Sequence, residues 1–242
     1  MSIDSKENMH FLEHLNELRK RLIFIIIAIT ITSCLSFLFS QEIFEFLTKP
    51  YHDAFTGNYL IGTGPAEAFL LKLKSAILFG LIIGSPFIFL QLWLFISPAL
   101  HQNERIFAAP FIITASCLFI GGVYFCYIAV LPFAFEFFKA EYASIGLTPT
   151  IRISEYFSIS VQAMVGFGVV FETPVLAFFL GKLGILSSQA LMNAGRYAIV
   201  GIFLISAILT PPDVITQLLM AGPLLILYAL SIVIVKFVEP KS

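Results

Sequence analysis

Six apolar runs, separated by short polar segments, constrain the fold of this chain more than any other feature of its sequence. An α-helix needs about 20 apolar residues to cross the hydrocarbon core of a bilayer. The composition agrees, because 59% of the residues are hydrophobic and only 12% are charged. A soluble domain of this size has to present more polar surface to water. The sequence therefore predicts an all-α integral membrane protein.

We expect six transmembrane helices within one polytopic domain that covers residues 1–242. The predicted spans are about 22–39, 77–96, 106–138, 159–183, 197–209 and 214–235. The third run is long, and it is best explained by one tilted helix that continues past the bilayer near Pro132. The fifth span is short and the sixth carries Gly222 and Pro223 in its interior. These two runs could also form one re-entrant hairpin around the turn at 210–213.

Six spans place both termini on one side of the membrane, and the basic residues indicate which side. Nine of the 14 Lys and Arg residues fall on the side of the termini, among them the cluster 19–21 directly before the first span. By the positive-inside rule, both termini are expected in the cytoplasm. Residues 1–21 are predicted to hold an amphipathic helix on the inner membrane surface, because one stripe is formed by Leu12, Leu15, Leu18 and Leu22.

Two carboxylates are candidates for an acidic patch on this otherwise basic surface. Glu17 lies in the amphipathic segment, and Glu104 is the only acid in the loop between spans two and three. Such a patch suits a basic ligand, because a carboxylate accepts a guanidinium bidentately. The plainer interpretation is a solvated helix face on which Glu17 supports Arg21 at i,i+4.

A short histidine pattern raises a different hypothesis. His10, Glu13 and His14 match H-x-x-E-H, a pattern of zinc peptidases. A catalytic zinc needs a third protein ligand, and the only other histidines are His52 and His101. A metal enzyme would contain bound zinc, but we expect no metal and no cofactor. The net charge of −1 gives no indication of nucleic-acid binding.

Glu172 is the most informative single residue, because it lies near the middle of the fourth span. A carboxylate at the centre of a membrane helix costs about 2.5–3.5 kcal/mol on insertion scales. We expect it to face the bundle interior, a recess or a partner helix. Gly168, one turn earlier, is expected to leave room beside it, and Pro174 to free a nearby backbone carbonyl.

An alternative function follows from the same residue. Glu172 could be the coupling carboxylate of a proton-coupled small-solute transporter. That hypothesis predicts two related halves with paired broken helices, and the sequence shows no convincing halves. A structural membrane scaffold, in which internal hydrogen bonds satisfy Glu172, is the least specific alternative.

Taken together, the chain resembles the TatC family, the multispanning core of the twin-arginine protein translocase. Single motifs are weak, but their order and spacing over six spans make the resemblance specific. The segments that carry it are 14–21 (HLNELRKR), Pro50, 64–69 (GPAEAF), 95–100 (FISPAL), 103–105 (NER), 171–174 (FETP) and 210–213 (TPPD).

The resemblance implies recognition in the bacterial inner membrane rather than bond chemistry. Members of the family form a concave bundle with short fifth and sixth spans. They bind signal peptides that carry two consecutive arginines on folded precursor proteins. They also assemble with single-span TatA- and TatB-like subunits, in several copies per complex, for export driven by the proton-motive force.

The resemblance also assigns residues. It implies that Glu17 and Glu104 contact the arginine pair, and that Arg19 and Phe95 shape that site. Glu172 is expected to meet polar groups of partner helices within the membrane. Roles in loop structure, assembly or transport are implied for Pro50, Pro98, Pro211 and Asp213.

Overall fold

The computed structural model describes residues 3–55, 59–97, 108–209 and 214–239, and within these ranges the chain is almost entirely helical. Six helical stretches are long and apolar enough to cross a membrane, which confirms the six predicted spans. The helices are α1 (Ile3–Phe37), α2 (Ser40–Ala54), α3 (Glu67–Ile96), α4 (Ala108–Phe125), a π-helical turn (Cys126–Val130), α5 (Leu131–Ser144), α6 (Ile153–Val170), α7 (Thr173–Lys182), α8 (Ser188–Leu209) and α9 (Val214–Val238).

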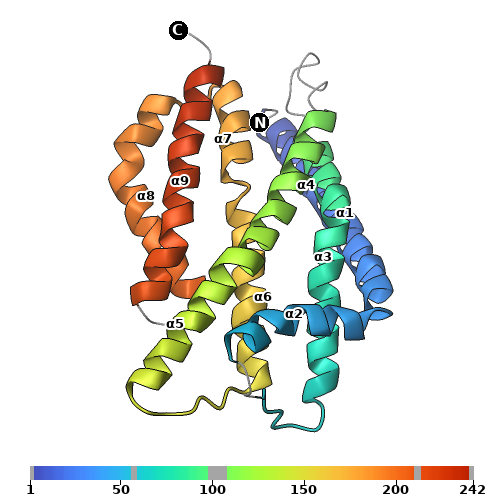
Figure 1. Cartoon of the computed structure of the whole chain (residues 1–242). Helices are drawn as coiled ribbons and strands as arrows, with labels where there is room; N and C mark the ends of the chain where they lie inside the picture. Colours follow the sequence, from blue (N-terminus) through green and yellow to red (C-terminus); the bar gives the residue numbers. More distant parts are fainter. Residues whose placement is uncertain (1–2, 56–58, 98–107, 210–213, 240–242) are drawn as a thin grey trace.

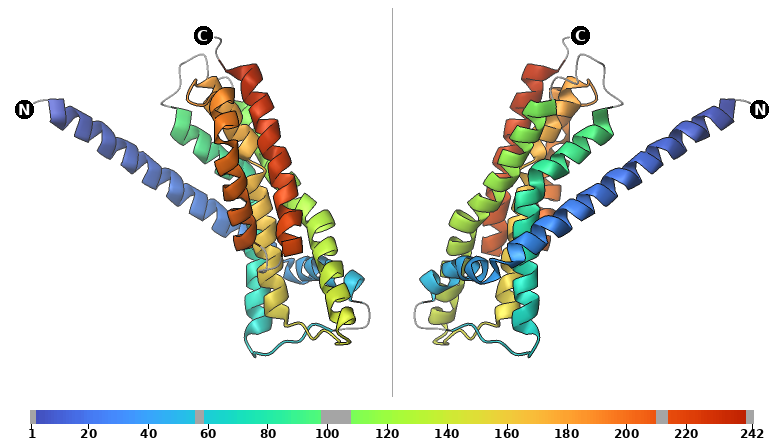
Figure 2. Two further views of the ribbon diagram at one scale, coloured as in Figure 1. Left: turned by 90° about the vertical axis from the view of Figure 1, so that its left-hand side faces the viewer. Right: turned by 90° about the vertical axis from the view of Figure 1, so that its right-hand side faces the viewer.

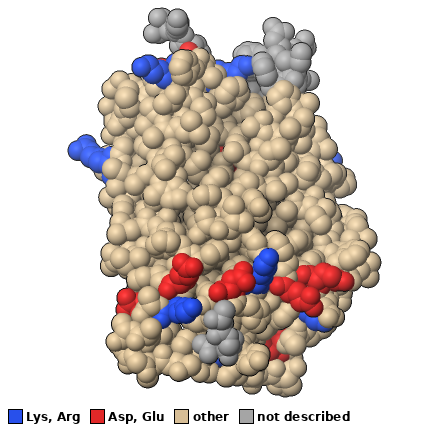
Figure 3. Space-filling view, in the orientation of Figure 1, with Lys and Arg blue, Asp and Glu red and all other residues tan. Residues whose placement is uncertain are grey.

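The spans run between two ends of the molecule (Figure 1). At the terminal end lie the start of α1 and the ends of α3 and α9. At the capped end, α2 lies across the spans beside the start of α3, the end of α5 and the start of α6. In the two side views, α1 leans away from the other helices toward the terminal end (Figure 2). Charged side chains gather near both ends, with a broad uncharged band between them (Figure 3).

Most helices are longer than the apolar runs that predicted them. The fifth span was expected to cover only 197–209, whereas α8 begins at Ser188 and has 22 residues. Its first two turns contain Gln189 and Asn193, whose side chains form a hydrogen bond of 3.2 Å. Because these residues are polar, the hydropathy pattern did not indicate this part of the helix. Both α8 and α9 are long enough to span, so no re-entrant hairpin is needed.

The third span is one continuous helical stretch that crosses the molecule obliquely (Figure 1). It contains the π-helical turn Cys126–Val130, in which the N–H of Leu131 donates to the carbonyl of Cys126. Pro132 follows at once, and a proline has no N–H and crowds the preceding turn. The wider turn accommodates that loss, so the expected tilted helix continues past Pro132 as α5.

Close backbone contact joins α1 to α3. The hydroxyl of Thr32 donates to the carbonyl of Gly80 at 2.7 Å. A Cβ atom placed on Gly80 would lie 2.6 Å from the backbone nitrogen of Ser33, and one on Gly84 would lie 3.2 Å from Oγ1 of Thr32. Gly80 and Gly84 are four residues apart, so together they form the small-residue contact that lets two membrane helices approach.

Aromatic side chains and carbonyl groups hold α2 on the capped end. Tyr127 stacks on Phe46 with 4.3 Å between ring centroids, and its hydroxyl donates to the Phe46 carbonyl at 2.8 Å. The hydroxyl of Tyr156 on α6 donates to the carbonyl of Leu47. Both tyrosines thus bond backbone carbonyl groups of α2, so this helix is fixed to the spans against which it packs.

Candidate functional site

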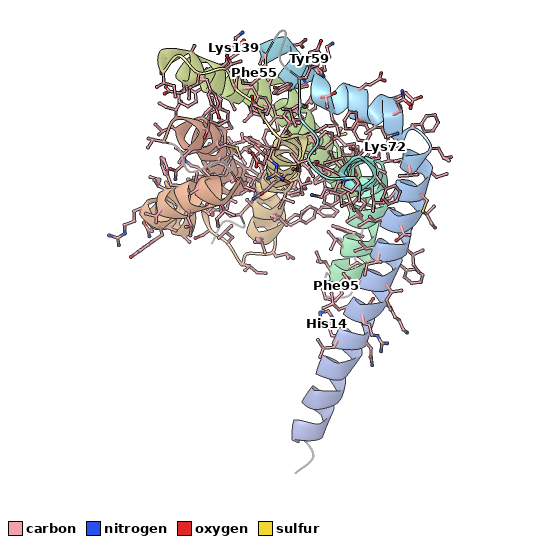
Figure 4. The ribbon with its side chains drawn as sticks, turned by 90° about the horizontal axis from the view of Figure 1, so that it is seen from below. His14, Phe55, Tyr59, Lys72, Phe95 and Lys139 are labelled. Carbon is pink, nitrogen blue, oxygen red and sulfur yellow. The ribbon has the colours of Figure 1, made fainter. Side chains whose placement is uncertain are left out.

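Five side chains come together where α1 and α3 meet near the terminal end. We call this group the α1–α3 cluster: His14, Glu17, Arg21, Gln91 and Phe95. His14, Glu17 and Arg21 follow one another at i,i+3 and i,i+4, so they share a face of α1. Gln91 and Phe95 are likewise one turn apart on α3. The rings of His14 and Phe95 stack with 4.5 Å between centroids, as seen where the two labelled side chains meet (Figure 4).

Arg21 connects the polar members of this cluster. Its Nη2 donates to Oε1 of Glu17 at 3.3 Å, and its Nη1 donates to Oε1 of Gln91 at 3.3 Å. The side chains of Arg21 and Glu17 are 27% and 31% exposed. The predicted i,i+4 pair is therefore present, and it also reaches across to α3. Both contacts are longer than the 2.7–2.9 Å usual for charged hydrogen bonds.

The structure brings together two of the four residues assigned to signal-peptide binding. Glu17 is joined to α3 through Arg21, and Phe95 is joined to α1 through His14. Arg19 is exposed, and its position two residues after Glu17 places it on a different face of α1. Glu104 lies outside the described residues.

Of the four loop residues with implied structural or transport roles, the structure describes one. Pro98, Pro211 and Asp213 lie outside the described residues. Pro50 is buried inside α2. It lines a recess of about 270 Å³ at the capped end, whose charged walls are Lys49, Asp53 and Glu136.

The side chains of His10 and Glu13, on which the zinc hypothesis rests, lie outside the described ones. His14 is stacked on Phe95. Among the described residues, no three His, Cys, Asp or Glu side chains gather in a way that could hold a metal ion.

Glu172 lies at a break within the fourth span, between α6 and α7. The residue is 8% exposed, and its Oε1 atom has no hydrogen-bond partner in the described structure. Pro174 accounts for the break, because its nitrogen cannot donate to the preceding turn. The hydroxyl of Thr173 donates instead to the freed carbonyl of Val170, at 2.6 Å. The predicted free carbonyl is thus present, but a neighbouring side chain satisfies it.

The expected role of Gly168 was wrong. A Cβ atom at this position would lie 2.7 Å from the ring of Phe119 and 3.0 Å from Val123, both on α4. Gly168 therefore allows α6 to pack closely on α4 and leaves no space for the Glu172 carboxyl. Beyond Glu172, Pro174 lines an apolar recess of about 270 Å³ between α4, α7 and α9.

Sequence reasoning missed two polar residues. Gln91 is buried, and it was inconspicuous because its partner Arg21 is 70 positions away. Glu67 accepts hydrogen bonds from the backbone N–H groups of Thr63 and Gly64, which fixes the segment before α3. The adjoining strand-like bridge pairs Ile61 with Arg152. A carboxylate three residues after a Gly-Pro turn is the signal that could have indicated this role.

A sequence profile described as "Sec-independent protein translocase protein (TatC)" matches residues 13–223 of the chain. Among curated proteins, the chain is similar to the Sec-independent protein translocase protein TatC of Helicobacter pylori strain J99. The two are 41% identical over 227 residues, which cover 94% of this chain and 89% of the relative. The TatC of Aquifex aeolicus is 38% identical over 97% of this chain and 98% of its own length.

A solved structure has the same fold. The crystal structure titled twin arginine translocase receptor TatC superposes with a TM-score of 0.85 at 38% sequence identity. The match covers 93% of this chain and 99% of the crystallised chain. The arrangement of the spans and the positions of the cluster therefore occur in a fold already known from experiment.

Proposed function

Since the chain belongs to the TatC family of Sec-independent protein translocase proteins, we propose that its α1–α3 cluster is part of a receptor site for twin-arginine signal peptides. The family makes the chain a multi-pass subunit of the Tat translocase in the bacterial inner membrane, and a transport component rather than an enzyme. We propose further that residues 1–242 act as one membrane domain.

One observation carries this proposal: the carboxylate of Glu17 already holds a guanidinium. Its partner Arg21 reaches it with a single nitrogen at 3.3 Å, while about a third of the Glu17 side chain stays exposed. A carboxylate that accepts one guanidinium at this geometry has the chemistry to accept another. The stacked pair of His14 and Phe95 lies one turn away and supplies an apolar wall beside it.

The second carboxylate of the proposed site is Glu104, assigned by the resemblance of the 103–105 segment. Two carboxylates match the two positive charges of consecutive arginines. Phe95 belongs to the wall of the site, and Arg19 to its exposed rim, where its charge influences the approach of a cationic peptide.

The proposed site faces the cytoplasm. Both termini lie at the terminal end (Figure 2), and nine of the 14 basic residues belong to that side. The positive-inside rule then places the cluster where a newly made precursor first meets the membrane. Pro50, Pro98, Pro211 and Asp213 serve loop structure, assembly or transport in this scheme.

Glu172 is proposed to dock a single-span TatA- or TatB-like helix. Its Oε1 is buried without a partner, and an apolar recess lies directly beyond it in the membrane region. A polar side chain on a partner helix would satisfy the carboxyl group where water is absent. A complex with several copies of these subunits, driven by the proton-motive force, would then export the folded precursor.

The receptor proposal is tested by peptide affinity in nanodiscs. Glu17→Gln and Glu104→Gln should each weaken binding of an Arg-Arg peptide by about 10- to 150-fold, equivalent to about 1.5–3 kcal/mol for one charged hydrogen-bonded pair. The affinity of a Lys-Lys peptide should fall much less, because an ammonium makes no bidentate contact. Binding should also weaken with salt, since the Debye length is about 8 Å at physiological ionic strength.

Glu42→Gln provides the matched control, because Glu42 is exposed on α2 at the capped end. Equal weakening of both peptides by Glu17→Gln would refute the bidentate account. Equal effects of Glu42→Gln and Glu17→Gln would refute the location of the site.

The docking proposal is tested by crosslinking to the single-span subunits. Glu172→Ala should reduce the crosslinks and leave affinity for the Arg-Arg peptide unchanged. Glu172→Gln should restore them in part, because an amide still forms hydrogen bonds. Normal crosslinks with lost transport would contradict docking and would favour a proton-relay role for Glu172.

A further inference from the structure

Arg21 is hydrogen-bonded to Glu17, the carboxylate that the proposed ligand would bind. Its guanidinium lies between Glu17 on its own helix and Gln91 on α3, with one nitrogen on each at 3.3 Å. Its Nε atom is buried and has no hydrogen-bond partner in the described structure. The guanidinium therefore uses only one nitrogen on Glu17, although a well-placed arginine can use two.

Resting on the proposed function, we infer that Arg21 sets the affinity of the site by competing with the ligand for Glu17. In the free protein it satisfies the carboxylate through one long contact. An incoming arginine gains two short contacts in exchange for that one, whereas an incoming lysine exchanges one contact for another. The competition lowers the affinity for both ligands by the same factor, and it leaves a net gain of contacts at Glu17 for arginine alone.

Gln91 makes this exchange feasible. It is a buried residue, so its amide is held in place by the surrounding helices. When Arg21 leaves Glu17, its Nη1 contact with Gln91 can persist, and the displaced guanidinium keeps one hydrogen bond.

The opposite role for Arg21 gives the opposite result. If Arg21 only positioned Glu17, its removal would release the carboxylate side chain and weaken every cationic ligand. If Arg21 acted only through its net charge, any neighbouring basic residue would act in the same way. The three roles therefore differ in the sign of the effect and in whether a neighbouring basic residue has the same effect.

The experiment compares Arg-Arg and Lys-Lys peptides on the full chain in nanodiscs. For Arg21→Gln we expect affinity for both peptides to rise by about tenfold, with the ratio of the two affinities unchanged. Arg21→Lys, which keeps the charge, should lie between this variant and the unaltered chain. Lys20→Gln is the charge control, since Lys20 is exposed and adjacent, and it should raise the two affinities by much less.

Weaker binding of both peptides to Arg21→Gln would overturn the inference in favour of positioning. A rise in affinity for Lys20→Gln as large as that for Arg21→Gln would overturn it in favour of net charge. Glu17→Gln in the same series distinguishes a failure of the proposed function from a failure of the inference about Arg21. If that variant binds the Arg-Arg peptide normally, the proposed function fails and the inference fails with it; if it binds weakly, the Arg21 results decide the inference alone.

Discussion

The two ends of the helical bundle use polar side chains differently. At the capped end, Tyr127 and Tyr156 donate to backbone carbonyl groups of α2, and Glu67 accepts from two backbone N–H groups. At the terminal end, the contacts of Arg21 run from side chain to side chain, at 3.3 Å each and partly exposed. These groups at the capped end form hydrogen bonds with the backbone, whereas Arg21 at the terminal end bonds side chains that a ligand can replace.

This difference separates stability from recognition. Loss of a hydrogen bond from a buried hydroxyl to a carbonyl costs free energy of folding. A long contact between two partly exposed side chains can be replaced by a ligand at little cost. We therefore expect substitutions at the capped end to lower stability and those in the α1–α3 cluster to alter binding.

Gly80→Ala should have the largest effect, because it breaks the contact that brings the two helices of the cluster together. The new Cβ would lie 2.6 Å from the backbone nitrogen of Ser33, so one helix must move. Overpacking of this kind costs about 1–3 kcal/mol. The movement should separate His14 from Phe95, which form the wall of the proposed site, and reduce affinity for an Arg-Arg peptide by at least about tenfold.

Peptide affinity in nanodiscs and thermal unfolding together check this prediction. Gly121→Ala is the matched control, because a Cβ at Gly121 would meet nothing within 4 Å. If Gly80→Ala binds the peptide as tightly as Gly121→Ala does, the cluster does not depend on the α1–α3 contact.

Tyr156→Phe should affect the capped end alone. The substitution removes the buried hydroxyl that donates to the Leu47 carbonyl. The expected loss is about 0.5–1.5 kcal/mol of unfolding free energy, measured as a lower unfolding temperature. Affinity for the Arg-Arg peptide should stay unchanged. Tyr59→Phe, at an 82% exposed position, should change neither quantity; a loss of affinity in Tyr156→Phe would show that the two ends are coupled.

Local patterns predicted those parts of the molecule that depend on one segment. Apolar runs gave the six spans, and i,i+4 spacing gave the pair of Glu17 and Arg21. The break at Pro174 followed from the missing N–H of proline. The amphipathic helix expected before the first span is present as the first part of α1, but α3 and α8 begin earlier than their apolar runs predicted.

Contacts between distant segments could not be read from either partner alone. Gly80 and Gly84 do not form a pattern that dominates their span, and their importance depends on Thr32 and Ser33 of another helix. Gly168 was expected to make room for Glu172, but the structure gives that space to Phe119. The neighbouring helix decides which side chain fills the space beside a small residue. One sequence does not specify which helix that neighbour is.

The smallest effect should come from Glu239, which tests whether every polar contact at the terminal end belongs to the binding site. Its carboxylate accepts from the backbone N–H of Ser188 at 2.6 Å and from the Ser188 hydroxyl at 2.7 Å, tying the end of α9 to the start of α8. These hydrogen bonds, with the backbone bond as the larger cause, lower the pKa of Glu239 below its ordinary value of 4.5. Unlike the Glu17 contact, this one includes fixed backbone, so we assign it to stability.

The sign of the pH effect follows from the direction of that shift. Because the folded chain binds the Glu239 proton less readily than the unfolded chain does, the contribution to stability is present above pH 4.5 and is lost as the pH falls below it toward the lowered pKa. Glu239→Gln should therefore unfold at a lower temperature than the unaltered chain near neutral pH, and the two unfolding temperatures should converge in acid. Thermal unfolding at a series of pH values measures the difference, in which the titration of all other carboxylates cancels. Parallel curves would contradict the assigned role, and weaker binding of the Arg-Arg peptide to Glu239→Gln would extend the binding site to α8 and α9.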